Sequence, residues 1–441
     1  MRMKRSGLAA LLLLSLPEMG WAEEPPWEAS DAGASRWHVL TRVETTTWML
    51  LSREGGAAEE GFIQVEPTFL LDGGPEFGID MGAPVRFWMW GGGEGLVRRE
   101  DWDSLSDWGQ LVRGLRWGSV DAPMSIWLGA IEEHSLLSGH LVRRYSNRAN
   151  PDYHPAGVAF AGTLGPLYTQ VFASDVLGAR LMGAELSLDV EHILFGQPED
   201  QGRYTLALSA VHDWGQAETR APSVTLAHLD ATAGVLLRPD YEIHVVAGWG
   251  GRPGERGAWG VVAGVGADVL TEKLILRLRL EARLQRGGFR QGFFGADYEL
   301  ARFQAAGAEG VPVVDARFPE GSSAFGEVEV GWDAVSYGGL YQHLTLSLGL
   351  EAFTWGRFDA DGRVAFQLFA RSLEVALKGL AVGAGEPGAR YLGAAEVRWR
   401  FLGGKLYVMG TGGTLLFPTE EGGLLRPRVF ASVGLGVDNA R

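Results

Sequence analysis

The sequence predicts an all-β chain folded as a single transmembrane, antiparallel, up-and-down β-barrel of about 18 strands, within about 14 to 22. Residues 389–401 read A-R-Y-L-G-A-A-E-V-R-W-R-F, so apolar and charged residues alternate. A strand sends successive side chains to opposite faces, which gives this segment one apolar and one charged face. The same alternation recurs along most of the chain, behind a segment with the features of an export signal.

The N-terminal segment divides into two parts. Residues 1–22 are expected to be a cleaved signal peptide, because basic residues precede a short apolar run and small residues at Gly20 and Ala22 mark a cleavage site. The apolar run is shorter than the ~20 residues of a membrane-spanning helix. Residues 23–35 are polar and contain proline, which predicts a flexible periplasmic leader. Residues 36–441 are expected to form the barrel as one domain.

Composition excludes several classes of protein. The formal charge is −15, and it becomes −17 without residues 1–22, which carry three basic residues and one acid. This charge argues against a nucleic-acid partner, whose phosphates require many lysine and arginine contacts. The chain has no cysteine, and therefore no disulfide, thiolate metal site or lipid-attachment cysteine.

About twenty short segments after residue 35 have strand character. No sustained helical period and no interdomain linker interrupt them, so a single domain is the simplest interpretation. The clearest segments are Phe62–Leu71, Tyr204–His212, Tyr241–Trp249, Lys273–Leu284, Phe293–Phe303, Phe325–Trp332, Leu340–Glu351, Arg363–Arg371, Glu374–Val382, Tyr391–Phe401, Lys405–Thr411 and Pro427–Val437.

Opposite charges suggest a register for the C-terminal strands. Directly opposed residues of a hairpin have a constant sum of residue numbers, and sums can be chosen that bring unlike charges together. The resulting hypothesis places Lys378 opposite Glu396 and Glu374 opposite Arg400. It also places Glu351 opposite Arg363. Each such pair would contribute only ~0.2–1 kcal/mol, but together the pairs would specify the register.

Connection lengths alternate in the last third of the chain. Gln304–Ser323 and Gly412–Arg426 are long, whereas Ser372-Leu373 and Leu402-Gly403 are tight. Long outer loops and short periplasmic turns are typical of outer-membrane barrels, in which an even strand number brings both ends of the chain to the periplasm.

Alternation alone does not say whether the apolar face points to a core or to lipid. Strands of ~9–11 residues can cross a bilayer at a tilt. Aromatic residues near strand ends suggest interfacial girdles, although aromatics also favour the interior of soluble sandwiches. These aromatics are Trp48, Trp88, Trp90, Trp117, Trp249, Trp332, Trp399 and Phe401.

On these features the chain resembles the broad class of bacterial outer-membrane porin-like barrels, with no subfamily indicated. The resemblance covers most of residues 36–437 and implies a bacterial outer-membrane location. It also implies outer-membrane lipid, lipopolysaccharide, the barrel-insertion machinery and small solutes as partners. Such barrels usually end on an aromatic residue, whereas this sequence ends G-V-D-N-A-R, and Phe430 is its final aromatic residue. The end of the last strand, or the way it is recognised, is therefore left open.

The charged strand faces supply the candidate pore-lining residues. In a membrane barrel the charged face lines the lumen, where rings of charge set ion selectivity. The alternative is a lattice of salt bridges that only stiffens the wall. The candidates are Arg277, Arg279, Glu281, Arg283, Asp297, Glu299, Glu327, Glu329, Glu351, Arg363, Gln367, Glu374, Lys378, Glu396, Arg398 and Arg400. Asp297 and Glu299 are expected on the strand after Lys273–Leu284, and Glu327 and Glu329 on the one after that.

A second candidate site is basic. Arg143, Arg144 and Arg148 lie in the densest polar cluster of the sequence. They could bind an anionic ligand or lipopolysaccharide phosphates through arginine forks. The alternative is a solvated outer loop, because a basic run is usually a solvated face.

The sequence offers no catalytic or cofactor motif. The histidines are His38, His134, His140, His154, His192, His212, His228, His244 and His343, and none has a metal-binding spacing such as H-E-x-x-H. No G-x-S-x-G elbow is present. We therefore expect no enzyme, no cofactor and no metal, with an outer-membrane hydrolase as a remote alternative because triads are not local in sequence.

The expected function is a porin-like channel for passive diffusion of small solutes, because barrels of this size tend to enclose an aqueous channel. The alternative is a non-conducting structural or adhesive barrel that uses outer loops such as Gln304–Ser323 for binding. The sequence predicts neither the solute nor the oligomeric state.

Overall fold

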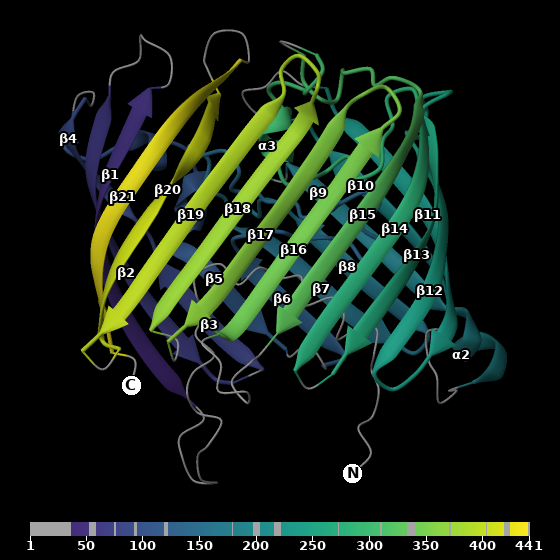
Figure 1. The fold of residues 1–441 in the computed structure, drawn as a ribbon, viewed down its shortest axis with the longest axis horizontal. Coiled ribbons are helices and arrows are strands. Elements are labelled where there is room, and N and C mark those ends of the chain that lie inside the picture. The colour runs from purple at the N-terminus through teal and green to yellow at the C-terminus, as the bar shows by residue number, and fades with distance from the viewer. Residues whose placement is uncertain are drawn as a thin grey trace.

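The structure is a computed structural model, and it is a closed β-barrel (Figure 1). It describes residues 37–52, 59–74, 76–91, 95–118, 122–178, 180–196, 203–215, 222–271, 273–308, 311–332, 341–369, 372–402, 404–418 and 424–439. The expected signal peptide and leader lie outside these residues.

Twenty strands of the described residues close the ring, each antiparallel to its neighbours, and β1 pairs with β21. The first half comprises β1 (His38–Ser52), β2 (Glu60–Asp72), β3 (Phe77–Gly82), β5 (Val112–Trp117), β6 (Met124–Gly129), β7 (Gly157–Leu164), β8 (Leu167–Ala173), β9 (Leu181–Asp189), β10 (Tyr204–Asp213) and β11 (Val224–Leu237). The second half comprises β12 (Tyr241–Gly251), β13 (Trp259–Leu270), β14 (Leu274–Arg286), β15 (Gly321–Trp332), β16 (Tyr341–Phe353), β17 (Phe358–Leu368), β18 (Leu373–Ala384), β19 (Arg390–Phe401), β20 (Leu406–Pro418) and β21 (Leu425–Asp438). The predicted barrel class is confirmed, with a strand number inside the predicted range.

One further strand, β4 (Val85–Trp90), continues β3. Thr68 of β2 pairs with Gly82 of β3, and Val65 of β2 pairs with Val85 of β4, so both pairings have one register. Pro84 lies between the two strands and has no N–H to donate to the ladder. The proline therefore interrupts what is otherwise a single strand.

The helices in the described residues are short. They are η1 (Arg99–Asp101), η2 (Ser106–Leu111), α2 (Val190–Phe195) and α3 (Tyr298–Ala301). Among the described residues, no helix has the length and apolar character needed to cross a membrane.

The apolar strand face points outward. On β14, Leu278 and Leu280 are 43% and 62% exposed, whereas the alternate residues Glu281 and Arg283 are 5% and 3% exposed. A soluble sandwich would show the reverse, with its charges in water. The barrel therefore offers an apolar wall to lipid and a charged face to its lumen.

Only some of the predicted girdle aromatics lie on the lipid-facing wall. Trp117, Trp249 and Trp399 are 59%, 57% and 61% exposed near strand ends, as expected for interfacial girdles. Trp48 and Trp88 belong instead to an apolar cluster with Phe62. The ring centroids of Phe62 and Trp88 are 4.4 Å apart. The prediction that Trp48 and Trp88 are girdle residues is therefore wrong.

The segment Phe293–Phe303 is not a strand, which corrects the prediction. It contains α3 and lies between β14 and β15. Phe293 and Phe294 are consecutive, and they are 1% and 0% exposed. Two consecutive buried aromatics do not fit a strand with one lipid-facing side, because such a strand would send one of them outward.

The predicted faces are right, but the predicted register is wrong. Glu374 lies opposite Arg398, and Lys378 lies opposite Ala394. Glu351 lies opposite Asp359. Each error is an even number of residues. An even shift keeps every side chain on its face, so facial alternation cannot detect it.

Candidate functional site

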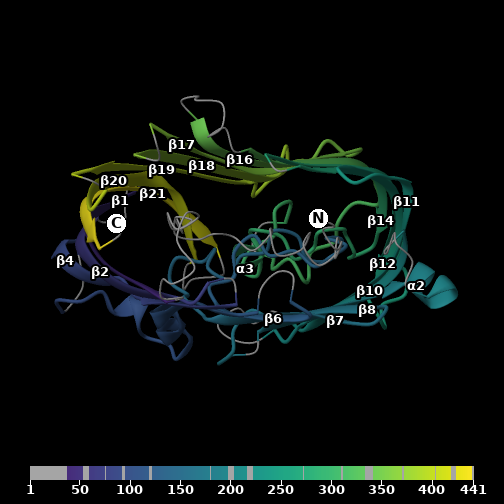
Figure 2. The same ribbon diagram turned by 90° about the horizontal axis from the view of Figure 1, so that it is seen from below.

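Two connections at one rim of the barrel fold into the lumen, and together they form what we call the plug. They are residues 130–156 between β6 and β7, and residues 287–308 and 311–320 between β14 and β15. In Figure 2, α3 of the second connection lies inside the ring. Leu141, Phe294 and the wall residue Phe172 are fully buried in a shared apolar core. The plug is thus packed against the barrel wall.

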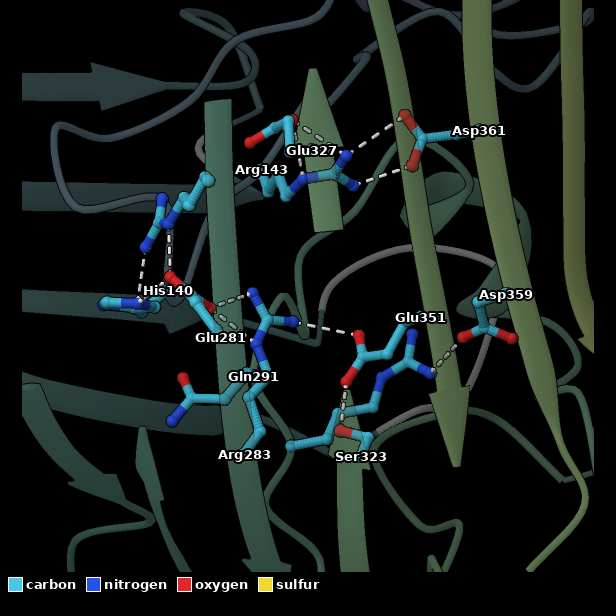
Figure 3. Close-up of polar contacts among 12 residues, drawn as sticks. His140, Arg143, Glu281, Arg283, Gln291, Ser323, Glu327, Glu351, Asp359 and Asp361 are labelled. Carbon is cyan, nitrogen blue, oxygen red and sulfur yellow. Dashed lines mark hydrogen bonds and ion pairs between the residues drawn. The ribbon is translucent and has the colours of Figure 1, made fainter. Parts of the chain in front are cut away.

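Arg143 and Arg144 bind the plug to the opposite wall. Arg143 contacts Glu327 at 2.9 Å and Asp361 at 2.7 Å, and it is shown between them in Figure 3. Arg144 reaches the same two carboxylates, at 3.1 Å and 2.5 Å. Arg148 donates to the backbone carbonyl of Pro155 at 3.3 Å.

These contacts correct the proposed lipopolysaccharide site. The side chains of Arg143 and Arg144 are 13% and 7% exposed. Their guanidinium groups already have carboxylate partners inside the barrel. The sequence pattern does not show this, because Asp361 falls between two predicted strands and lies instead on β17.

His140 joins the plug to two separate strands. Its Nδ1 lies 2.6 Å from Asp230 Oδ1 on β11, and its Nε2 lies 3.0 Å from Glu281 Oε1 on β14. His228 Nδ1 lies 2.9 Å from the other oxygen of Asp230. Asp230 thus holds two imidazole rings, one from the plug and one from the wall.

Glycines make this convergence sterically feasible, because β12 and β13 separate β11 from β14. A Cβ at Gly248 would lie 2.4 Å from Asp230 Oδ1, and one at Gly264 would lie 2.7 Å from Glu281 Cγ. Both distances are shorter than real Cβ contacts allow. The bare glycine surface therefore lets the two carboxylates lean toward His140.

The charges of β14 and β15 form a paired lattice. Arg277 lies opposite Glu329 at 3.1 Å, and Arg279 lies opposite Glu327 in the ladder. Arg279 also contacts Glu281 and His140. Arg283 contacts Glu281 at 2.7 Å and Glu351 at 2.9 Å. These predicted residues face the lumen. However, β15 pairs directly with β14, so the strand that was predicted between them does not intervene.

Asp297 and Glu299 belong to the plug and not to a wall strand, which corrects their predicted position. Asp297 is ion-paired with Arg390 of β19. Burial alone would raise the pKa of the Asp297 carboxyl, but Arg390 and Arg290 hold it below its ordinary value. Glu299 contacts Arg302 at 3.0 Å.

The lumen face of β17 to β19 is more open. The side chain of Lys378 is 48% exposed, and its Nζ lies 3.8 Å from Glu133 of the plug. Glu396 is exposed, while Arg363 and Gln367 are half-buried. Burial raises the pKa of Glu132, the neighbour of Glu133, despite the nearby charge of Lys378.

Glu374, Arg398 and Arg400 form a buried cluster where the barrel closes. Arg398 contacts Glu374 at 3.8 Å and Glu44 of β1 at 3.3 Å. Arg400 contacts Asp438 of β21 at 2.9 Å. Through these contacts the cluster joins β18 and β19 to the first and last strands of the barrel.

A closed ring with an apolar outer wall and a charged lumen is built as a porin-like outer-membrane barrel. The sequence matches no protein-family model and no curated protein. Several solved porins match in structure. Pseudomonas aeruginosa OccK2 (OpdF) has 11% identity and a TM-score of 0.35, with 91% of this chain and 98% of that chain covered. Acinetobacter baumannii OccAB3 has 8% identity and a TM-score of 0.38, with the same coverage. Likenesses this weak carry no argument about the solute.

Proposed function

We propose that this protein is a porin-like outer-membrane channel for passive diffusion of small solutes, exported by a cleaved signal peptide. The solute path runs between the plug and the lumen face of β17 to β19. The observation that carries this proposal is the exposure of Lys378, whose side chain is 48% exposed although it points into a barrel. An ammonium group on a lumen face requires water or a partner, so its exposure indicates an aqueous path.

Charges of both signs border this path. Glu133 of the plug faces Lys378 across 3.8 Å, and Glu396 lies on the neighbouring strand. Charged groups at a constriction bias which ions pass. The lumen face of β17 to β19 borders the proposed path on one side, and the plug borders it on the other.

A non-conducting structural barrel is the second candidate, and the packed core of the plug favours it. The expectation that Gln304–Ser323 is an outer contact surface is corrected, because Val313, Val314 and Phe318 of this segment are buried. A structural role would therefore rest on the wall and on other outer connections.

Single-channel conductance of the refolded protein in a planar bilayer separates the two candidates. Stable steps that scale with salt concentration are expected for the channel. Lys378→Glu should shift the ion selectivity toward cations, whereas Lys405→Glu, the same charge change in an exposed rim turn, should shift it less. Silence from protein that shows β-structure and heat-modifiable migration would favour the structural role.

A further inference from the structure

His140, His228 and Asp230 place metal-ligating atoms together at the junction of plug and wall. One ligand atom from each residue lies within 4.8 Å of the others, and all three residues are buried. His140 and His228 are 88 positions apart in the chain, so no spacing motif could reveal the group. We propose that this cluster binds a divalent first-row transition-metal ion such as Zn²⁺.

The donor set fits that class of metal. Two imidazoles and a carboxylate suit Zn²⁺, Ni²⁺ and Cu²⁺, whereas Mg²⁺ and Ca²⁺ prefer oxygen ligands alone. The ligand contacts at Asp230 are 2.6 Å and 2.9 Å. Bonds of 2.0–2.1 Å around tetrahedral zinc separate neighbouring ligand atoms by roughly 3.3 Å. Binding would therefore lengthen these two contacts slightly, and would hold all three ligand atoms, now within 4.8 Å of one another, at about that separation as an ion replaces the shared protons.

The outer nitrogens of both imidazole rings contact further side chains. Glu281 Oε1 lies 3.0 Å from His140 Nε2. Gln291 Nε2 lies 3.1 Å from His228 Nε2, and the Oε1 of this buried amide has no hydrogen-bond partner among the described residues. Figure 3 shows His140, Glu281 and Gln291 beside β14. These contacts orient the two rings so that both Nδ1 atoms face Asp230.

The surroundings of the cluster include bare glycines and a small cavity. The glycines of β12 and β13 give Asp230 and Glu281 room beside the wall, and both carboxylates are buried there. Gln291 and Arg283 also line a lumenal cavity of about 60 Å³, which is larger than one ion. Gln291 thus contacts both this cavity and His228.

Arg279 competes with a bound cation. Its guanidinium contacts both His140 and Glu281. A divalent ion would repel it, but the Arg279 side chain is 22% exposed and Glu327 lies directly opposite on β15. The Arg279 guanidinium can therefore move from Glu281 to the carboxylate of Glu327 when metal binds.

Zinc titration of the refolded, chelator-treated barrel tests this site without any reference to conductance. One equivalent of Zn²⁺ should bind, and Asp230→Asn and His228→Gln should each weaken binding by about 10-fold or more. Arg279→Gln should tighten binding by removing the competing cation. Arg277→Gln is the matched control, because Arg277 lies on the same face and pairs with Glu329.

The proposal is overturned if neither the wild type nor Arg279→Gln binds one equivalent of Zn²⁺. It is also overturned if Asp230→Asn and His228→Gln, both with heat-modifiable migration, bind Zn²⁺ as tightly as the wild type. Mg²⁺ at the same concentration should give no stoichiometric binding.

Discussion

The lumen faces of β14 and β18 both carry charges, yet they are in opposite environments. Glu281 and Arg283 of β14 are 5% and 3% exposed, whereas the side chain of Lys378 on β18 is 48% exposed. The plug covers the first two residues and leaves Lys378 accessible, although it also contacts β17 to β19 through Asp361, Lys378 and Arg390. The same alternation therefore produces a buried ionic lattice in one part of the lumen and an exposed charge in another.

The largest effect should come from detaching the plug from the wall. Arg143→Glu would place a third carboxylate beside Glu327 and Asp361, and breaking such a buried pair costs about 3–5 kcal/mol. The lattice of β14 and β15 should then become accessible, with higher single-channel conductance. Arg277→Glu changes the same charge away from the plug and should leave conductance closer to the wild-type value. Unchanged conductance in Arg143→Glu would contradict the role of Arg143 in holding the plug.

Acidification should weaken the plug through His134. Burial lowers the pKa of His134 to about 4 from 6.5, so the stability that its neutral form contributes is fully present above pH 6.5 and lost as pH falls toward 4. At ~1.4 kcal/mol per pKa unit, the loss approaches about 3 kcal/mol.

Hydrogen exchange of residues 130–156 at pH 7 and pH 4.5 measures this effect. Glu132, whose pKa burial raises, acts in the opposite direction. The difference between wild type and His134→Phe therefore isolates the imidazole. Equal pH dependence in both proteins would exclude His134 as the cause.

The glycines of β12 and β13 should tolerate side chains poorly. A Cβ at Gly264 would lie 2.5 Å from the Leu280 carbonyl oxygen, and such overpacking costs about 1–3 kcal/mol. Gly331→Ala is the control, because its nearest contact would be an ordinary 3.5 Å. Thermal unfolding should show a clear loss for Gly264→Ala and little change for Gly331→Ala. Similar midpoints would mean that the backbone around Gly264 has room to relax.

The smallest effect should come from an exposed rim pair. Arg286 and Glu320 lie 3.0 Å apart, and their side chains are 54% and 61% exposed. Solvent-exposed pairs contribute about 0–1 kcal/mol. Arg286→Ala should leave both unfolding and conductance near the wild-type values, and a large loss of either would show that the rim is coupled to the plug.

Sequence alternation predicted the fold and the lumen faces, because a strand's two faces are fixed by local geometry. It could not fix the register of Glu374 and Lys378, since shifts of two or four residues preserve the same faces. Turn geometry decides among these registers. The turn between β18 and β19 contains Gly385 and Gly388, which have positive φ values of 94° and 70°.

The periodicity of the sequence could not predict the plug. Phe293 and Phe294 are buried by long-range packing against residues 130–156 and the wall, which no local pattern encodes. For the same reason His140 gave no signal, because its partners Asp230 and Glu281 are 90 and 141 positions away. The consecutive aromatics Phe293 and Phe294 were an available hint for the second connection.

The most direct test of the two-environment account is the reaction of single cysteines with a water-soluble thiol reagent in the conducting channel. The natural chain has no cysteine, so each introduced thiol reports alone. Lys378→Cys should react rapidly and lower the single-channel conductance. Ser323→Cys, on the lumen face of β15 but only 6% exposed, should react far more slowly. Equal rates at the two positions, or an unreactive thiol at position 378, would contradict an aqueous path at Lys378 beside a buried lattice on β14 and β15.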